Sequence, residues 1–277
     1  MTRSDEEDRA VGLDRLPILM YHEIAAPPDT ASRLAVSPGA FARQLGYLRD
    51  AGFTAVTFTA AAAALSGDAC GLPARPIVLT FDDGFADNHR EALPLLARYG
   101  FTATVFVTTG WIADAGPRSA GRRPGRMLCW SQIRELAAAG VEIGAHSHSH
   151  PQLDQIGLSR LRDELGTSRK LLEDGLGRAV PSMAYPFGYS NARVREMTRE
   201  AGYQYACAVA NAIARTGQDR FAVTRLTVRA STRQATFEQV VQGSNHSRIY
   251  LKDHALTRGF AVARRSRAAL GDVYRRA

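Results

Sequence analysis

The chain has 277 residues, of which 45% are hydrophobic and 22% are charged. This composition is typical of a soluble globular protein, and the length suits one large domain or two small ones. No apolar run approaches the roughly 18 residues that a membrane-spanning helix needs, so we expect none. The first ten residues, MTRSDEEDRA, lack the apolar segment of a signal peptide, which predicts a cytoplasmic protein. The odd, widely spaced cysteines Cys70, Cys129 and Cys207 likewise favour free thiols in a reducing compartment.

The net charge of +8 is unevenly distributed along the chain. Eight basic and two acidic residues lie from Arg248 onward, which leaves 27 basic and 25 acidic residues before that point. The excess therefore belongs to a C-terminal tail, 248–277, which we expect to be helical. A solvated terminal helix is the simpler interpretation. The alternative is peripheral contact with an anionic membrane, and we expect no specific nucleic-acid partner.

In chain order, apolar runs and helical periodicity alternate along the sequence. Strands are predicted at 17–24, 53–58, 76–84, 101–112, 141–148, 182–188 and 203–209. Helices are predicted at 37–52, 87–100, 130–140, 159–177 and 190–202. Ser37 and Pro38 are a plausible N-cap and first residue for the helix that begins there. This alternation predicts an α/β fold with a parallel sheet, open or closed, in a single domain at 17–247 between a polar leader, 1–16, and the basic tail.

Polar groups follow three of the predicted strands. They are Tyr21-His22-Glu23, Asp82-Asp83, and the histidines His146, His148 and His150. Functional groups gather at the C-terminal ends of parallel strands, so these clusters are expected to meet. Adjacent carboxylates after a buried strand repel one another, which a bound cation would relieve. The alternative for Asp82-Asp83 is an exposed turn, because Asp-Asp-Gly is a common turn sequence.

The three clustered histidines favour a metal site over a solvated polar loop. Neutral imidazole is the commonest protein ligand of divalent metals, and catalytic zinc usually has three protein ligands with one open position. Two histidines and a carboxylate would make such a set. The residue types alone do not indicate which two histidines bind.

With TFDDG at 80–84 and HSHSH at 146–150, the chain resembles the polysaccharide deacetylases, the NodB-homology enzymes of carbohydrate esterase family four. The resemblance extends from about Pro17 to Arg229. It implies a distorted (β/α) barrel, often with seven strands. It also implies that Asp83, His146 and His150 bind a metal and that Asp82 is the catalytic base, whereas His148 falls at a variable position of the motif.

The segment PILMYHEI, 17–24, is similar to family members that act on poly-N-acetylglucosamine. In those proteins an N-terminal Tyr-His supplies a histidine that other members carry near the end of the domain. The resemblance makes His22 the candidate general acid, and a buried histidine bonded to the backbone is the alternative. The family usually has an arginine where this chain has Ala184, and we hypothesise that Arg225 replaces it in orienting Asp82.

The resemblance implies an N-deacetylase that releases acetate from N-acetylated sugars. It implies Zn²⁺ as the metal, with Co²⁺, Ni²⁺ or Fe²⁺ as alternatives. Backbone N–H groups at Tyr185 or Phe187 are candidate oxyanion donors, and Pro186, Phe187 and Trp130 are candidates for groove walls or for core packing. We expect the substrate at the inner membrane face. A non-catalytic carbohydrate-binding protein and a hydrolase of another small amide are the alternatives, and the acyl sugar and the oligomeric state stay open.

Overall fold

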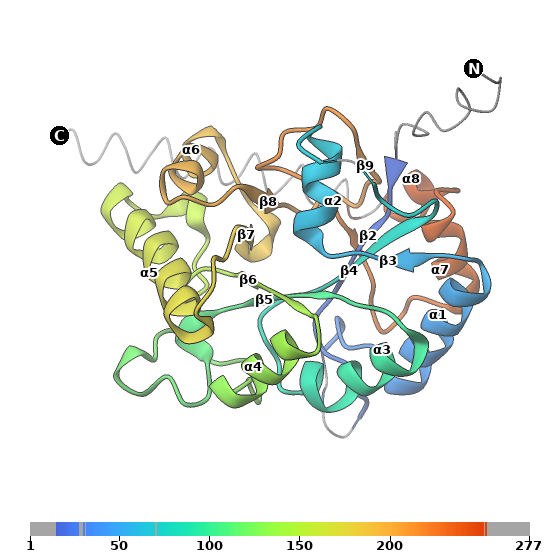
Figure 1. Cartoon of the computed structure of the whole chain (residues 1–277), viewed down its shortest axis with the longest axis horizontal. Coiled ribbons are helices and arrows are strands. Elements are labelled where there is room, and N and C mark those ends of the chain that lie inside the picture. The colour runs from blue at the N-terminus through green and yellow to red at the C-terminus, as the bar shows by residue number, and fades with distance from the viewer. Residues whose placement is uncertain (1–14, 28–29, 31, 70, 252, 254–277) are drawn as a thin grey trace, which may run out of the picture.

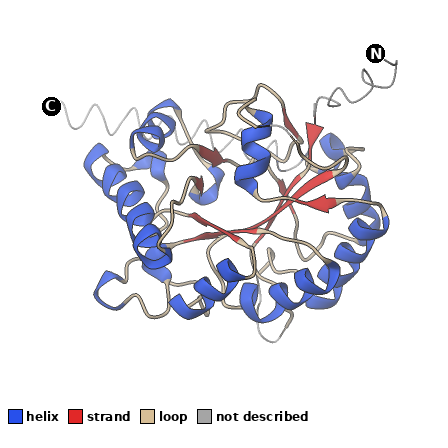
Figure 2. Ribbon diagram, in the orientation of Figure 1, coloured by secondary structure: helices blue, strands red, loops and turns tan. Residues whose placement is uncertain are grey.

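The computed structural model describes residues 15–27, 30, 32–69, 71–251 and 253. At its centre lies a curled parallel sheet (Figures 1 and 2). In spatial order its strands are β10 (Leu226–Thr227), β2 (Ile18–Tyr21), β4 (Pro76–Phe81), β5 (Thr104–Val107), β6 (Glu142–Ala145), β7 (Ser182–Ala184) and β8 (Tyr205–Cys207). A short strand, β3 (Thr54–Ala55), pairs with the start of β4.

One segment joins the two ends of this sheet. Val223 forms a parallel bridge with Cys207 of β8, and three and four residues later Leu226 and Thr227 pair with β2. The sheet therefore curls round until residues 223–227 touch both of its edges. This arrangement confirms the expected distorted (β/α) barrel of seven strands, and it places Arg225 at the point of closure.

Helices cover the outside of the curled sheet (Figure 2). They are α1 (Pro38–Asp50), α3 (Leu93–Tyr99), α4 (Trp130–Ala138), α5 (Leu158–Leu176), α6 (Ala192–Glu200), α7 (Gln234–Val241) and α8 (His246–Ile249). The predicted start of α1 is confirmed, because Ser37 Oγ accepts a hydrogen bond from Ala40 N and Pro38 is the first helical residue. No helix among the described residues is long and apolar enough to cross a membrane.

The helix α2 (Phe58–Leu65) was not expected from the sequence, because residues 53–58 were predicted to form a strand. The strand ends at Ala55, and Thr57 caps α2 by accepting from Ala60 N. Phe58, Ala61, Ala62 and Leu65 have helical spacing, and they pack into the barrel interior with Val78, Phe106 and Cys207. The strand prediction was wrong because the helical spacing of the apolar residues is hard to recognise within a run of alanines. The apolar face of this helix fills one end of the barrel.

Several other predicted elements are shorter than expected. The strand at 101–112 is regular only over β5 and then turns into a 3₁₀ segment at Thr109–Trp111. The helix at 87–100 begins as a π-turn at Asn88–Ala92. Near the N-terminus, β1 (Arg15–Leu16) pairs antiparallel with β9 (Ala214–Arg215). Most of the leader and of the basic tail lies outside the described residues, as does Cys70, whereas Cys129 and Cys207 are free thiols.

Alternate residues of each strand face the barrel interior. On β4, Val78 belongs to the interior cluster, whereas Leu79 and Phe81 pack toward the surrounding helices. Thr80 and Asp82 continue the inward series from Val78. The same period on β6 directs Gly144 and His146 inward. Gly144 leaves room for Phe106, because a Cβ at this position would lie 2.5 Å from Phe106 Cδ1.

The π-turn anchors the chain that continues from β2 toward the carboxyl ends of the strands. Asp87 Oδ1 accepts a hydrogen bond from Ile24 N at 3.0 Å, and Asn88 Nδ2 donates to His22 O at 2.9 Å. Burial raises the pKa of Asp87 to about 6. The position of His22 therefore depends on a buried acid four residues after Asp83.

Gly144→Ala should lower the free energy of unfolding by about 1–3 kcal/mol, because the new methyl group overlaps Phe106 in a filled interior. Urea unfolding followed by circular dichroism measures the change. Gly166→Ala is the matched control, since Gly166 is exposed in the middle of α5 and its Cβ would meet no atom within 4 Å. This control should be neutral or more stable by up to about 1 kcal/mol. Equal stability of Gly144→Ala and the wild type would contradict the packing described.

Asp87→Asn should change the pH dependence of stability. The pKa of this carboxyl is higher in the folded than in the unfolded state, so the folded protein keeps the proton to a higher pH. The free energy of unfolding therefore falls as pH rises from about 4 to about 6. The loss amounts to at most about 3 kcal/mol. The neutral amide can still accept from Ile24 N, so the variant should gain stability over the wild type near pH 7.5 but not near pH 4. Urea unfolding at both values tests this, with exposed Asp163→Asn as the control; an equal difference at both pH values would refute it.

Candidate metal and catalytic site

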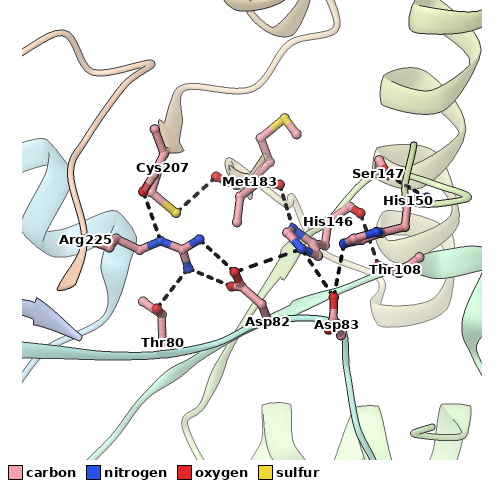
Figure 3. Close-up of polar contacts among 12 residues, drawn as sticks. Thr80, Asp82, Asp83, Thr108, His146, Ser147, His150, Met183, Cys207 and Arg225 are labelled. Carbon is pink, nitrogen blue, oxygen red and sulfur yellow. Dashed lines mark hydrogen bonds and ion pairs between the residues drawn. The ribbon is translucent and has the colours of Figure 1, made fainter. Parts of the chain in front are cut away.

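Asp83, His146 and His150 converge on one point at the carboxyl ends of the strands. One potential ligand atom from each lies within 4.8 Å of the others. His146 Nε2 lies 3.5 Å and His150 Nε2 lies 3.3 Å from Asp83 Oδ1, as Figure 3 shows. Asp83 Oδ1 is buried and has no well-aligned hydrogen bond within the described part of the chain. Two imidazole nitrogens and a carboxylate oxygen are a donor set that fits zinc with an open position.

The orientation of His146 suits it to be a ligand. The side chain follows β6 into the barrel interior, and its Nδ1 donates to Ala184 O at 2.8 Å, which directs Nε2 at Asp83. A hydrogen bond of this kind fixes the tautomer and ring direction of metal-binding histidines. Burial lowers the pKa of His146 to about 4, so the ring is neutral near pH 7 and can donate an electron pair.

Asp82 forms a buried ion pair instead. Arg225 Nη1 donates to Asp82 Oδ1 at 2.6 Å and Arg225 Nη2 donates to Asp82 Oδ2 at 2.7 Å. Arg225 is fully buried, and its guanidinium also donates to Thr80 Oγ1 and lies 5.6 Å from the Phe106 ring centroid. Burial alone would raise the pKa of Asp82, but the Arg225 charge and hydrogen bonds hold it well below its ordinary value. The structure thus brings Arg225 into direct contact with Asp82.

His22 lies where two cavities meet. A cavity of about 360 Å³ contains the metal-site residues, and one of about 710 Å³ continues past Phe85 and Arg126. His22, Leu34 and Asp83 line both. The Nδ1 atom of His22 is buried without a hydrogen-bond partner among the described residues. The main-chain oxygen of His22, by contrast, accepts a hydrogen bond from Asn88, so the backbone is fixed while the ring stays available to a ligand.

Aromatic side chains surround His150. Phe187 is 52% exposed, lines the 360 Å³ cavity and meets the His150 ring at a centroid distance of 4.8 Å. Its φ of 60° is unusual for a bulky residue and turns the ring outward at the rim. Tyr189 stacks on Phe187 at 6.1 Å. Trp111 stacks on His150 at 4.7 Å, a contact that sequence reasoning missed because Trp111 follows a different strand.

Two predicted site residues lie elsewhere or are otherwise engaged. Trp130 on α4 packs against Gly175 of α5 and lines neither cavity at the metal site. The Tyr185 N–H donates to Cys207 O, and its hydroxyl donates to Phe221 O. Tyr185 therefore has no free N–H for an oxyanion, which leaves Phe187 as the candidate of the two. Pro186 is buried and begins the turn that presents Phe187.

His148, the middle histidine, does not join the other two. Its Nδ1 lies 2.9 Å from Thr109 Oγ1, and the side chain lines neither of the two cavities. Burial lowers its pKa. The motif HSHSH thus supplies two rings to the candidate metal site and one that contacts the neighbouring loop.

Comparisons with known proteins agree with this site. Residues 71–206 match the family model for polysaccharide deacetylase. YxkH of Bacillus subtilis, which is named for the same family, is 29% identical over 77% of this chain and 71% of its own length. The poly-β-1,6-N-acetyl-D-glucosamine N-deacetylase of Staphylococcus aureus is 25% identical, over 48% of this chain and 47% of its own. This chain thus matches about half the length of the staphylococcal relatives.

Solved structures share the fold over most of the chain. The deacetylase PplD of Streptococcus pyogenes, solved with acetate, has a TM-score of 0.73 at 25% identity and covers 82% of this chain and 98% of its own. IcaB of Ammonifex degensii has a TM-score of 0.67 at 26% identity and covers 83% and 96%. The family motifs are thus assembled at one site, on a barrel that these solved deacetylases share, and residues 71–206 form a polysaccharide deacetylase domain, a domain of the hydrolase class.

Proposed function

We propose that this protein is a metal-dependent N-deacetylase that hydrolyses the acetamide of N-acetylated amino sugars in a glycan and releases acetate. One observation carries the proposal. Two neighbouring carboxylates are held in different ways, Asp83 against two imidazoles and Asp82 against a buried arginine. This division suits amide hydrolysis at a metal, with one carboxylate as ligand and one as proton acceptor.

Asp83, His146 and His150 are the residues that would hold the ion. The orphaned Asp83 Oδ1 and the neutral His146 Nε2 support a cation between them. When bound, Zn²⁺ or a similar divalent ion would polarise the acetamide carbonyl and acidify the attacking water. Co²⁺, Ni²⁺ and Fe²⁺ suit the same donors.

Asp82 would accept the proton of the attacking water. The bidentate contact with Arg225 keeps the carboxylate ionised and fixes its plane. The Phe187 N–H would donate to the developing oxyanion at the rim of the cavity. His22 would then protonate the departing amine, which leaves poorly without a proton, and its place on the wall that both cavities share supports that role.

The substrate we propose is a sugar chain rather than a single sugar. The two cavities continue from each other on either side of His22 and Asp83, so a chain could pass across the metal site. Phe187 and Tyr189 offer aromatic faces for a sugar ring. Poly-β-1,6-N-acetylglucosamine, the polymer for which the staphylococcal relatives are named, is the first candidate. Cytoplasmic action at an anionic membrane face, through the basic residues after Arg248, stays a prediction.

Purified protein should release acetate from N-acetylglucosamine oligomers, with β-1,6- and β-1,4-linked chains compared side by side. Chelation should abolish release, and added Zn²⁺ or Co²⁺ should restore it. Asp83→Ala should lose both metal and activity. Asp82→Asn should keep the metal and lose activity by about 10²–10⁴-fold, because it removes the proton acceptor.

Metal content by mass spectrometry separates these two variants, and Asp163→Asn, exposed on α5, serves as a control for the charge change. Full turnover by Asp82→Asn would refute its role as base. Absence of acetate release from every acetylated glycan, with a loaded metal site, would instead favour a non-catalytic binding protein or a hydrolase of another amide.

Arg225→Lys should lower kcat by about 10–100-fold while metal content stays unchanged, since a lysine cannot make the bidentate contact that orients Asp82. Metal analysis and a thermal melt separate this effect from misfolding. Arg220→Lys is the matched control, because Arg220 also pairs with an aspartate, Asp68, but lies outside both cavities at the metal site. Unchanged turnover in Arg225→Lys would remove Arg225 from the mechanism.

A further inference from the structure

The loop that carries the histidines, residues 147–150, has a backbone that needs outside support. Ser147 and His150 have φ values of 62° and 59°. Neither is glycine, and a residue other than glycine keeps such a strained conformation only where its surroundings impose it. A bond within the loop, from His150 N to Ser147 Oγ at 3.0 Å, supplies part of that support.

Glu164 supports the loop from the adjoining helix α5. Its Oε2 accepts hydrogen bonds from His148 N at 2.9 Å and from Ser149 N at 2.7 Å, and its Oε1 accepts from the Ser149 hydroxyl. On the opposite side of the loop, Gly110 N donates to His148 O at 2.7 Å. The loop is therefore clamped between a carboxylate and a neighbouring turn.

The position of Glu164 is costly for a carboxylate. It is 5% exposed and lies on the apolar face of α5, between the fully buried Leu161 and Leu165. Burial of a charge is unfavourable unless strong hydrogen bonds or a counter-charge offset it. Here the hydrogen-bond donors all belong to the loop, and the exposed Arg160 lies 4.0 Å away through its Nε. The proposed hydrolysis gives Glu164 no task in proton transfer, so its burial calls for another reason.

We propose that Glu164 is a positioning residue for the metal site, which holds loop 147–150 so that His150 Nε2 points at Asp83. This inference rests on the proposed metal-dependent function. Glu164 fixes the N–H groups of the two residues before His150, and through them the backbone direction at His150. Glu164 lies outside the HSHSH motif in the sequence, and it acts on the metal only through His150.

The test is metal affinity, measured on the metal-free protein without any substrate. Glu164→Ala should bind Zn²⁺ about 10–100-fold more weakly than the wild type in competition with a chromophoric chelator. It should also change the visible absorption of bound Co²⁺. Glu164→Gln should restore affinity to within a few-fold, because the amide oxygen can accept both N–H groups and the amide nitrogen can donate to Ser149 Oγ. Asp163→Ala, the exposed neighbour on α5, should bind like the wild type.

A double-mutant cycle tests whether Glu164 acts through His150. In a His150→Ala background, Glu164→Ala should cause little further loss of Zn²⁺ affinity, since the residue it positions is gone. An equal loss in both backgrounds would overturn the proposal, as would wild-type affinity in folded Glu164→Ala. Should Glu164→Ala fail to fold, Glu164→Asp keeps the charge but shortens the reach, and wild-type affinity there would overturn it too. If the wild type bound neither ion, the proposed function itself would fail.

Discussion

The buried pair of Arg225 and Asp82 is the interaction on which the site and the barrel both depend. Each charge loses several kcal/mol of hydration inside the barrel, and only a well-aligned partner offsets that loss. Here the two groups meet through two hydrogen bonds, and Thr80 Oγ1 takes a further guanidinium N–H. Because Arg225 lies on the segment that joins β8 to β2, the contact that orients Asp82 also ties the closing segment to β4.

The same strand end gives two adjacent carboxylates different environments. Asp82 continues the inward alternation of β4 and lies in the interior with Arg225. Asp83 leaves the strand with a φ of 75°, so its side chain turns from the arginine toward the histidines. A strained residue at this point is consistent with a functional constraint, because a straight continuation of the strand would direct the second carboxylate to the opposite face.

The sequence predicted the parts of the site that depend on local pattern. A buried apolar run ending in Asp82-Asp83 and a second strand ending in histidines were enough to bring these groups to one edge of a parallel sheet. The alanine-rich α2, the contact of Trp111 with His150 and the packing of Trp130 on Gly175 were not predicted. Each depends on packing between residues that are far apart in the sequence, and the spacing of residues along the chain does not determine that packing. Glu164 does carry a signal in the sequence, because it is a carboxylate within an apolar helical stripe.

The alternation His-Ser-His-Ser-His shows why local pattern is insufficient. In a straight strand, His146, His148 and His150 would share one face and be equivalent. The left-handed backbone at Ser147 breaks that alternation, so His148 turns to Thr109 while His146 and His150 meet at Asp83. Hydrogen bonds to Glu164 and from Gly110, together with the bond from His150 N to Ser147 Oγ, hold the loop in this conformation. The difference between the two proposed ligands and His148 therefore arises from tertiary contacts and not from the motif itself.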